Sequence, residues 1–109
     1  MNEVQVVSFW PDTDKDTVSL DVTDSPQSIR FMTQLGTDNR IVAMLWNSGE
    51  NEVFVKIGTQ NVISSINTSY PIPPGMKEPI LVSDRGEFIS AVCLPGKTSK
   101  LYISTGYGS

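Results

Sequence analysis

Residues 40–57 read RIVAMLWNSGENEVFVKI. In the first part, residues 40–47, apolar side chains fall on both faces of an extended chain, which is typical of a central strand or of one covered by a neighbour. The polar residues SGEN then form a turn. In residues 52–57 the three β-branched side chains alternate with others, which is the period-2 pattern of a half-buried strand. This segment therefore predicts two strands joined by a turn.

The same pattern of short apolar runs and turn clusters continues along the whole chain. Val, Ile and Thr make up 29 of the 109 residues, whereas Ala and Leu make up 8. Branching at Cβ suits a pleated sheet, and the best helix formers are almost missing. The sequence therefore predicts an all-β domain. We expect eight or nine strands, in residues 3–10, 17–23, 28–35, 40–47, 52–57, 61–68, 77–83, 88–94 and 100–104.

The spacing of these runs, roughly 8–12 residues with turns between them, is typical of a two-sheet antiparallel sandwich or a barrel, and we expect the sandwich. The Cys–Trp–Cys pattern of immunoglobulin domains is absent, so we expect a jelly-roll-like arrangement. Residues 88–94 and 100–104 are predicted to pair as a terminal hairpin. Three prolines in residues 70–75 predict an extended segment across the end of the sheets. The length fits a single domain, residues 1–109, with a flexible tail from about residue 105.

The charges and the missing residue types exclude several functions. Eight Lys and Arg are scattered along a chain of net charge −4, and a nucleic-acid partner requires clustered cations. There is no histidine, which removes the commonest general base and the commonest metal ligand. No apolar run is long enough to span a membrane, and the first residues do not resemble a signal peptide. We therefore expect no cofactor, no metal, no catalytic residue and no membrane contact.

Two carboxylate groups and one thiol are the remaining candidates for chemistry. Asp12, Asp14 and Asp16 are either a solvated turn or a site for a structural cation, because the glycine and the glutamate of a calcium loop are missing. Asp84 and Glu87 are either a turn or the carboxyl pair of a glycosidase, and the turn is the better interpretation. Cys93 lies in an apolar run and is predicted to be a small core residue rather than a reactive thiol.

Five aromatic residues are candidates for an interface. Trp10 and Trp46 lie at strand ends beside turns, where they either cap the core or contact a sugar or a protein. Phe54 points away from the buried face of its strand, and Tyr70 and Tyr107 lie in irregular segments.

The second half of the chain resembles the small capsid decoration proteins, or cement proteins, of tailed bacteriophages. The resemblance lies in the strands and turns of residues 53–58, 70–75, 88–94 and 101–108. It implies a jelly-roll-like domain, made in the host cytoplasm, that binds the outside of the virion. There it would bridge subunits of the major capsid protein as a homodimer or homotrimer and stabilise the head. No catalytic residue transfers from this family.

The sequence thus predicts a structural binding protein rather than an enzyme. The alternative is a carbohydrate-binding module, such as an accessory domain of a phage tail or fibre, in which Trp10 and Trp46 would contact a glycan.

Overall fold

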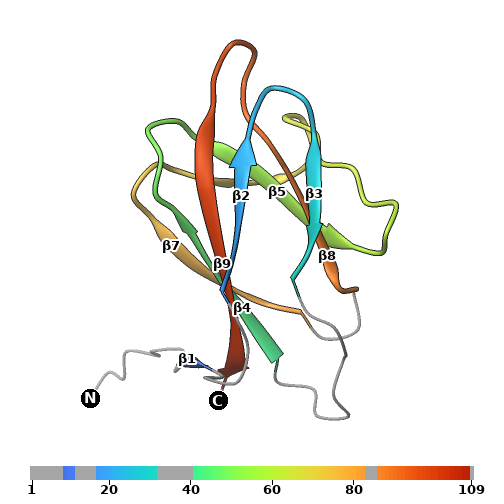
Figure 1. Cartoon of the computed structure of the whole chain (residues 1–109), viewed down its shortest axis with the longest axis vertical. Helices are drawn as coiled ribbons and strands as arrows, with labels where there is room; N and C mark the ends of the chain where they lie inside the picture. Colours follow the sequence, from blue (N-terminus) through green and yellow to red (C-terminus); the bar gives the residue numbers. More distant parts are fainter. Residues whose placement is uncertain (1–8, 12–16, 32–40, 83–85, 109) are drawn as a thin grey trace, which may run out of the picture.

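The part of the chain that the structure describes consists of strands, turns and loops, without a helix. The computed structural model describes residues 9–11, 17–31, 41–82 and 86–108, with the backbone alone for residues 9–11, 81, 107 and 108. Within these ranges there are nine strands (Figure 1). They are β1 (Phe9–Pro11), β2 (Val18–Val22), β3 (Gln27–Arg30), β4 (Ile41–Asn47), β5 (Val53–Gly58), β6 (Tyr70–Ile72), β7 (Lys77–Leu81), β8 (Phe88–Val92) and β9 (Ser99–Gly108).

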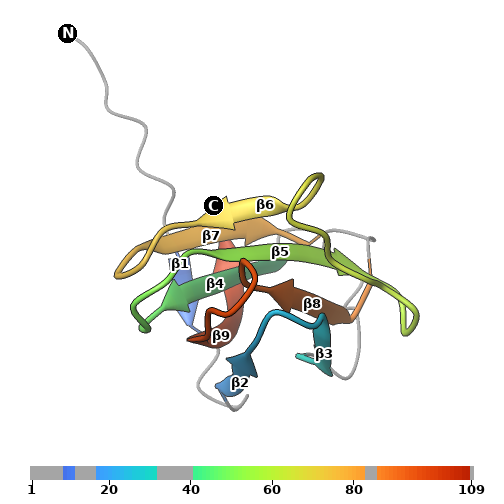
Figure 2. The same ribbon diagram turned by 90° about the horizontal axis from the view of Figure 1, so that it is seen from above.

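The strands form two antiparallel sheets. In the first sheet β9 is central. On one side it pairs with β4, which in turn pairs with β7. On its other side β9 pairs with β2 through residues 99–103 and with β1 through residues 106–108. The second sheet has the order β3-β8-β5-β6. Figure 2 shows the edge strands β6 and β7 at one side of the sandwich and β2 and β3 at the opposite side. The predicted all-β antiparallel sandwich is confirmed.

Strand pairing is nested along the chain. From β2 onward, the first strand pairs with the last (β2 with β9), and β3 with β8, β4 with β7 and β5 with β6 follow. One long hairpin folded over itself gives this order, and the β4–β9 and β5–β8 pairs close the two sheets. Nested pairing of eight strands that form two sheets is the strand order of a jelly roll. The jelly-roll-like arrangement stays a prediction, which the nested pairing supports.

One apolar core lies between the two sheets. Leu45, Leu101 and Ile103 are fully buried from the first sheet, and Val53 and Ile89 from the second. Burial of each such aliphatic side chain contributes roughly 1.5–3 kcal/mol relative to exposure. The predicted alternation is confirmed in β2 and β5. β4 lies inside the sheet, between β9 and β7, and its outer face runs from buried Val42 through half-buried Met44 to exposed Trp46.

The predicted terminal hairpin is wrong. β8 pairs with β3 and β5 in the second sheet, whereas β9 pairs in the first sheet. The chain crosses between the sheets at residues 93–98, where the Cys93 amide donates to Thr23 O (2.8 Å) and the Gly96 amide to an Asp24 carboxylate oxygen (2.9 Å). Local turn signals around Pro95 and Gly96 indicated a turn correctly but carried no information about which sheet follows it.

Three further expectations need correction. Residues 61–68 form no strand; they belong to a loop whose buried Val62 and Ser64 cover the second sheet. Residues 70–72 are extended as predicted, but they pair with β5 as an edge strand, where proline is tolerated because one side of the strand needs no donor. The expected flexible tail is the end of β9, because residues 106–108 pair with β1 and residues 105–107 with β4.

Asn47, at the end of β4, is a fully buried amide that joins both sheets. Its Nδ2 donates to the carbonyl oxygens of Asn51 and Ile72, each at 2.8 Å. Its Oδ1 accepts from the Gly49 amide (3.1 Å) and the Ser99 hydroxyl (2.6 Å). Ile72 belongs to β6 of the second sheet and Ser99 to β9 of the first, so one side chain ties the two layers together.

Replacement of Asn47 by Ala should lower the free energy of unfolding by roughly 2–5 kcal/mol, because buried partners would lose their hydrogen bonds. Urea unfolding followed by circular dichroism measures this change. Asn67→Ala, at an exposed turn position, is the control and should change the free energy by less than about 0.5 kcal/mol. Equal effects of the two substitutions would contradict the role of Asn47.

Candidate binding surface

The outer face of the first sheet carries two stacked aromatic rings. Trp46 of β4 and Tyr102 of β9 are opposite each other in register. Their ring centroids are 5.3 Å apart, and the ring planes differ by 25°. This geometry is favourable for aromatic pairs, which gain about 0.5–1.5 kcal/mol beyond the burial of their area.

Lysine ammonium groups lie over both aromatic rings. Lys77 of β7 is opposite Trp46 in register, and its Nζ lies 5.5 Å from the centre of the indole. Lys100 of β9 places its Nζ 5.7 Å from the centre of the Tyr102 ring. We call Lys77, Trp46, Tyr102 and Lys100 the aromatic ladder. Each ring thus has one ring neighbour and one cation neighbour.

The aromatic ladder remains open to solvent. Trp46 is 40% exposed, although a fully buried position lies on each side of it in β4. Asp21 of β2 lies 3.5 Å from the Lys100 ammonium group and is itself exposed, so an acidic group lies at the β2 side of the surface. The exposed part of the Trp46 indole and the exposed Lys77 side chain are therefore available to a partner on this face.

The structure places three of the five predicted interface residues on different parts of the sandwich. Trp46 lies on the outer face of the first sheet, and half-buried Phe54 pairs with Val92 on the outer face of the second. Tyr70 lies at the edge strand β6. Trp10 and Tyr107 are opposite each other in register, but their side chains lie outside the described residues.

Sequence reasoning did not predict Tyr102 as part of a site. The residue lies inside an ordinary alternating strand, and only the register between β4 and β9 places it beside Trp46. The sequence does place Lys100 two positions before Tyr102, so that both lie on the same face of the strand. Without knowledge of the strand pairing, this spacing is a weak indication of a site.

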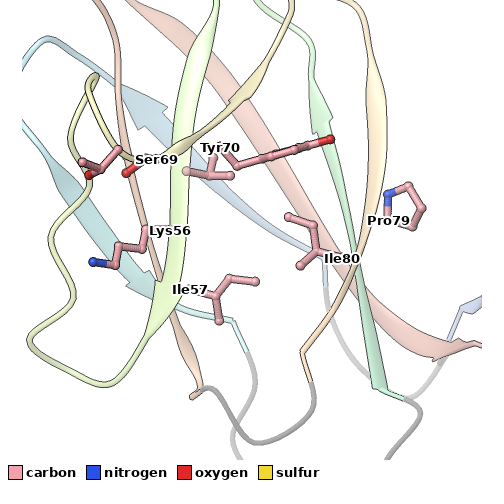
Figure 3. Close-up of a pocket in the computed structure, with 8 residues that line it drawn as sticks. Lys56, Ile57, Ser69, Tyr70, Pro79 and Ile80 are labelled. Carbon is pink, nitrogen blue, oxygen red and sulfur yellow. The ribbon is translucent and has the colours of Figure 1, made fainter.

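A groove lies between the edges β6 and β7, where the two sheets diverge. Its volume is about 520 Å³, and it is lined by Val55, Lys56, Ile57, Thr68, Ser69, Tyr70, Pro79 and Ile80. Figure 3 shows the Tyr70 ring extending across the groove towards the side of Pro79 and Ile80. The Tyr70 hydroxyl donates to a Glu78 carboxylate oxygen (3.3 Å), and the charge of Glu78 raises the pKa of Tyr70. This contact links the two sheets at their open side.

The acidic side chains of the described residues form no cluster of metal-ligand composition. Within the described ranges no three His, Cys, Asp or Glu side chains are grouped so that they could hold a metal ion. Glu87 accepts a hydrogen bond from Arg30 at 2.6 Å, in a partly exposed ion pair. Asp84 and the aspartates at positions 12, 14 and 16 lie outside the described residues. Within the same ranges there is no helix long and apolar enough to cross a bilayer.

Cys93 is buried in the core, as predicted, with 1% of its surface exposed. Burial raises the pKa of its thiol, and the nearby negative charge of Asp24 raises it further. A thiol whose pKa is raised stays protonated and is a poor nucleophile at neutral pH. The position therefore contributes packing rather than reactivity.

Compared with models of known protein families and with curated proteins, the chain matches none of them.

The stack of Trp46 and Tyr102 predicts a favourable coupling energy. In a double-mutant cycle of Trp46→Ala and Tyr102→Ala, the two losses of stability should fail to add by about 0.5–1.5 kcal/mol. Urea unfolding of the four proteins measures the coupling. Additive losses would show that the rings do not interact in solution.

Cys93 predicts a loss of stability at alkaline pH. In the unfolded chain the thiol ionises near pH 8.5, whereas the folded state keeps it neutral to a higher pH, so rising pH favours unfolding. The contribution of Cys93 to the free energy of unfolding is fully present below the pKa of the thiol in the unfolded chain, and it decreases as the pH rises above that pKa. Wild type should therefore lose more stability than Cys93→Ala when thermal melts are compared at increasing pH above the unfolded pKa; parallel declines would contradict the raised pKa.

Proposed function

We propose that this protein is a structural binding protein of the capsid decoration type, which attaches to the outside of a phage shell and stabilises it. The observation that carries the proposal is the aromatic ladder, a set of exposed and half-buried side chains in mutual contact on the outer face of a β-sandwich. The resemblance of residues 53–58, 70–75, 88–94 and 101–108 to decoration proteins supports the same class.

The composition of the ladder is suited to a protein partner. Aromatic residues are enriched at the centres of protein interfaces, where truncation of a few of them removes most of the binding energy. The Trp46 ring is already held by Tyr102 and Lys77, so little rotamer freedom would be lost on binding. In a shell, many copies of such a modest contact would act together. The proposed partner is the major capsid protein, and the proposed location is the virion surface.

A carbohydrate-binding module is the second candidate, because Trp46 is an exposed indole. Sugar rings, however, stack on aromatic faces that are free. The Trp46 ring is stacked on Tyr102, and the ammonium group of Lys77 lies over the same ring. A glycan would therefore have to displace the lysine before it could stack. The ladder favours contact through ring edges and cations over contact through ring faces.

The direct test is binding of the purified protein to undecorated shells of tailed phages, measured by co-sedimentation. Binding should be saturable in the micromolar range, and Trp46→Ala should weaken it at least about tenfold, which corresponds to 1.4 kcal/mol. Ile63→Ala, which alters a 68% exposed apolar residue on the 59–69 loop, should bind like the wild type.

Two results would reject the decoration proposal. Absence of binding to shells, together with absence of the protein from purified virions, would remove it. Saturable binding on a glycan array that is lost in Trp46→Ala would replace it with the carbohydrate-binding function.

A further inference from the structure

The edges of the two sheets differ in how they are protected against pairing with another strand. Natural proteins blunt exposed sheet edges with short strands, prolines, lysines and charged residues that point inward. β7 contains Lys77 and Pro79. It also contains Glu78, which is opposite the buried Leu45 and is therefore a charged residue on the core-facing side of the strand. β6 is three residues long and contains Pro71.

β1 and β3 are protected in similar ways. β1 has three residues and ends with Pro11. β3 has four residues and ends with Arg30, which is paired with Glu87. Both are shorter than the strands of about five to six residues that sheets usually contain.

β2 lacks each of these protections. It has five residues, Val18–Val22, with no proline and no lysine. Its core-facing side chains are all apolar: Val18 and Leu20 are half-buried beside the core, and Val22 is fully buried. Among the described residues β2 is hydrogen-bonded to β9 alone, so alternate backbone groups along its other edge point away from the sheet.

We propose that β2 is a dimerisation edge, which pairs antiparallel with the β2 strand of a second copy of this chain. Pairing centred on Leu20 is self-complementary. Val18 would face Val22 of the second copy and Leu20 would face Leu20, so apolar residues meet on the core side. Ser19 would face Asp21, so no like charges lie opposite each other on the outer side. A two-fold axis of this kind gives the closed, isologous dimer that is commonest among homo-oligomers.

The dimer has a consequence for the binding surface. A two-fold axis between antiparallel edge strands is perpendicular to the sheet, so the outer faces of both copies point the same way. The two aromatic ladders would then lie on one continuous sheet. Their Tyr102 residues would be three strand spacings apart across the sheet and two residues apart along the strands, which gives a separation of about 16 Å. Two linked contacts bind far more tightly than one. This last point rests on the proposed function, whereas the dimer itself does not.

The test uses the purified full chain and no shell. Sedimentation equilibrium at micromolar to submillimolar concentration should give a mass twice the 12.0 kDa of one chain. Leu20→Lys should raise the dissociation constant at least tenfold, because it brings two cations together at the axis. Ile80→Lys is the matched control: Ile80 is also half-buried against the core, but on the protected edge strand β7, and its dimer should persist.

A second variant keeps the test decisive if Leu20→Lys fails to fold. Opposite Cβ atoms in an antiparallel pair are about 4.5–5.5 Å apart, close to the span of a disulfide. In a Cys93→Ala background, Leu20→Cys should therefore form a covalent dimer on mild oxidation, and Ile80→Cys should not.

Three outcomes would overturn the dimer. They are a wild-type chain that remains at 12.0 kDa throughout the concentration range, a dimer abolished by Ile80→Lys but not by Leu20→Lys, and equal cross-linking of the two cysteine variants. A confirmed dimer that does not bind shells would reject the decoration function and leave the β2 edge established.

Discussion

The buried side chain of Asn47 is the constraint on which the arrangement of the two sheets depends. An amide in an apolar interior is tolerated only when its donors and acceptor are satisfied. Asn47 meets this condition with four side-chain hydrogen bonds, to Asn51, Ile72, Gly49 and Ser99. Its backbone is fixed as well, because the Asn47 amide donates to Met76 O (3.0 Å) and the Gly75 amide donates to Asn47 O (2.7 Å). The turns that follow β4 and precede β7 and β9 are therefore set around one residue.

This constraint also orients the candidate binding surface. Side chains alternate along a strand, so the inward position of Asn47 directs the adjacent Trp46 outward, where Tyr102 and Lys77 meet it from the two neighbouring strands. Gly49 serves the same junction, because a β-carbon there would overlap Ser99 Oγ. The polar junction and the aromatic ladder are thus opposite faces of one strand end. The hydrogen bonds of Asn47 therefore hold the strand end from which Trp46 projects.

Periodicity predicted the strands better than it predicted their partners. The alternation in residues 17–23 and 52–57, and the two apolar faces of 40–47, identified β2, β5 and the central β4 correctly. Pairing depends on which sheet a strand joins after a turn, and turn residues such as Pro95 and Gly96 do not encode that choice. The terminal hairpin was therefore wrong. For the same reason the sequence named Trp46 as a candidate interface residue at a strand end but left core capping as the alternative, and Tyr102 and the two lysines required the register.

The most direct test of the central claim is amide hydrogen exchange followed by NMR. The Gly49 amide is bonded to Asn47 Oδ1 and the Gly75 amide to Asn47 O. If Asn47 unites the two layers, these turn amides should open only with the whole domain and show the same protection free energy as the amides of β4 and β9. Exchange of Gly49 and Gly75 at the rate of an exposed loop, while β4 and β9 remain protected, would contradict the account.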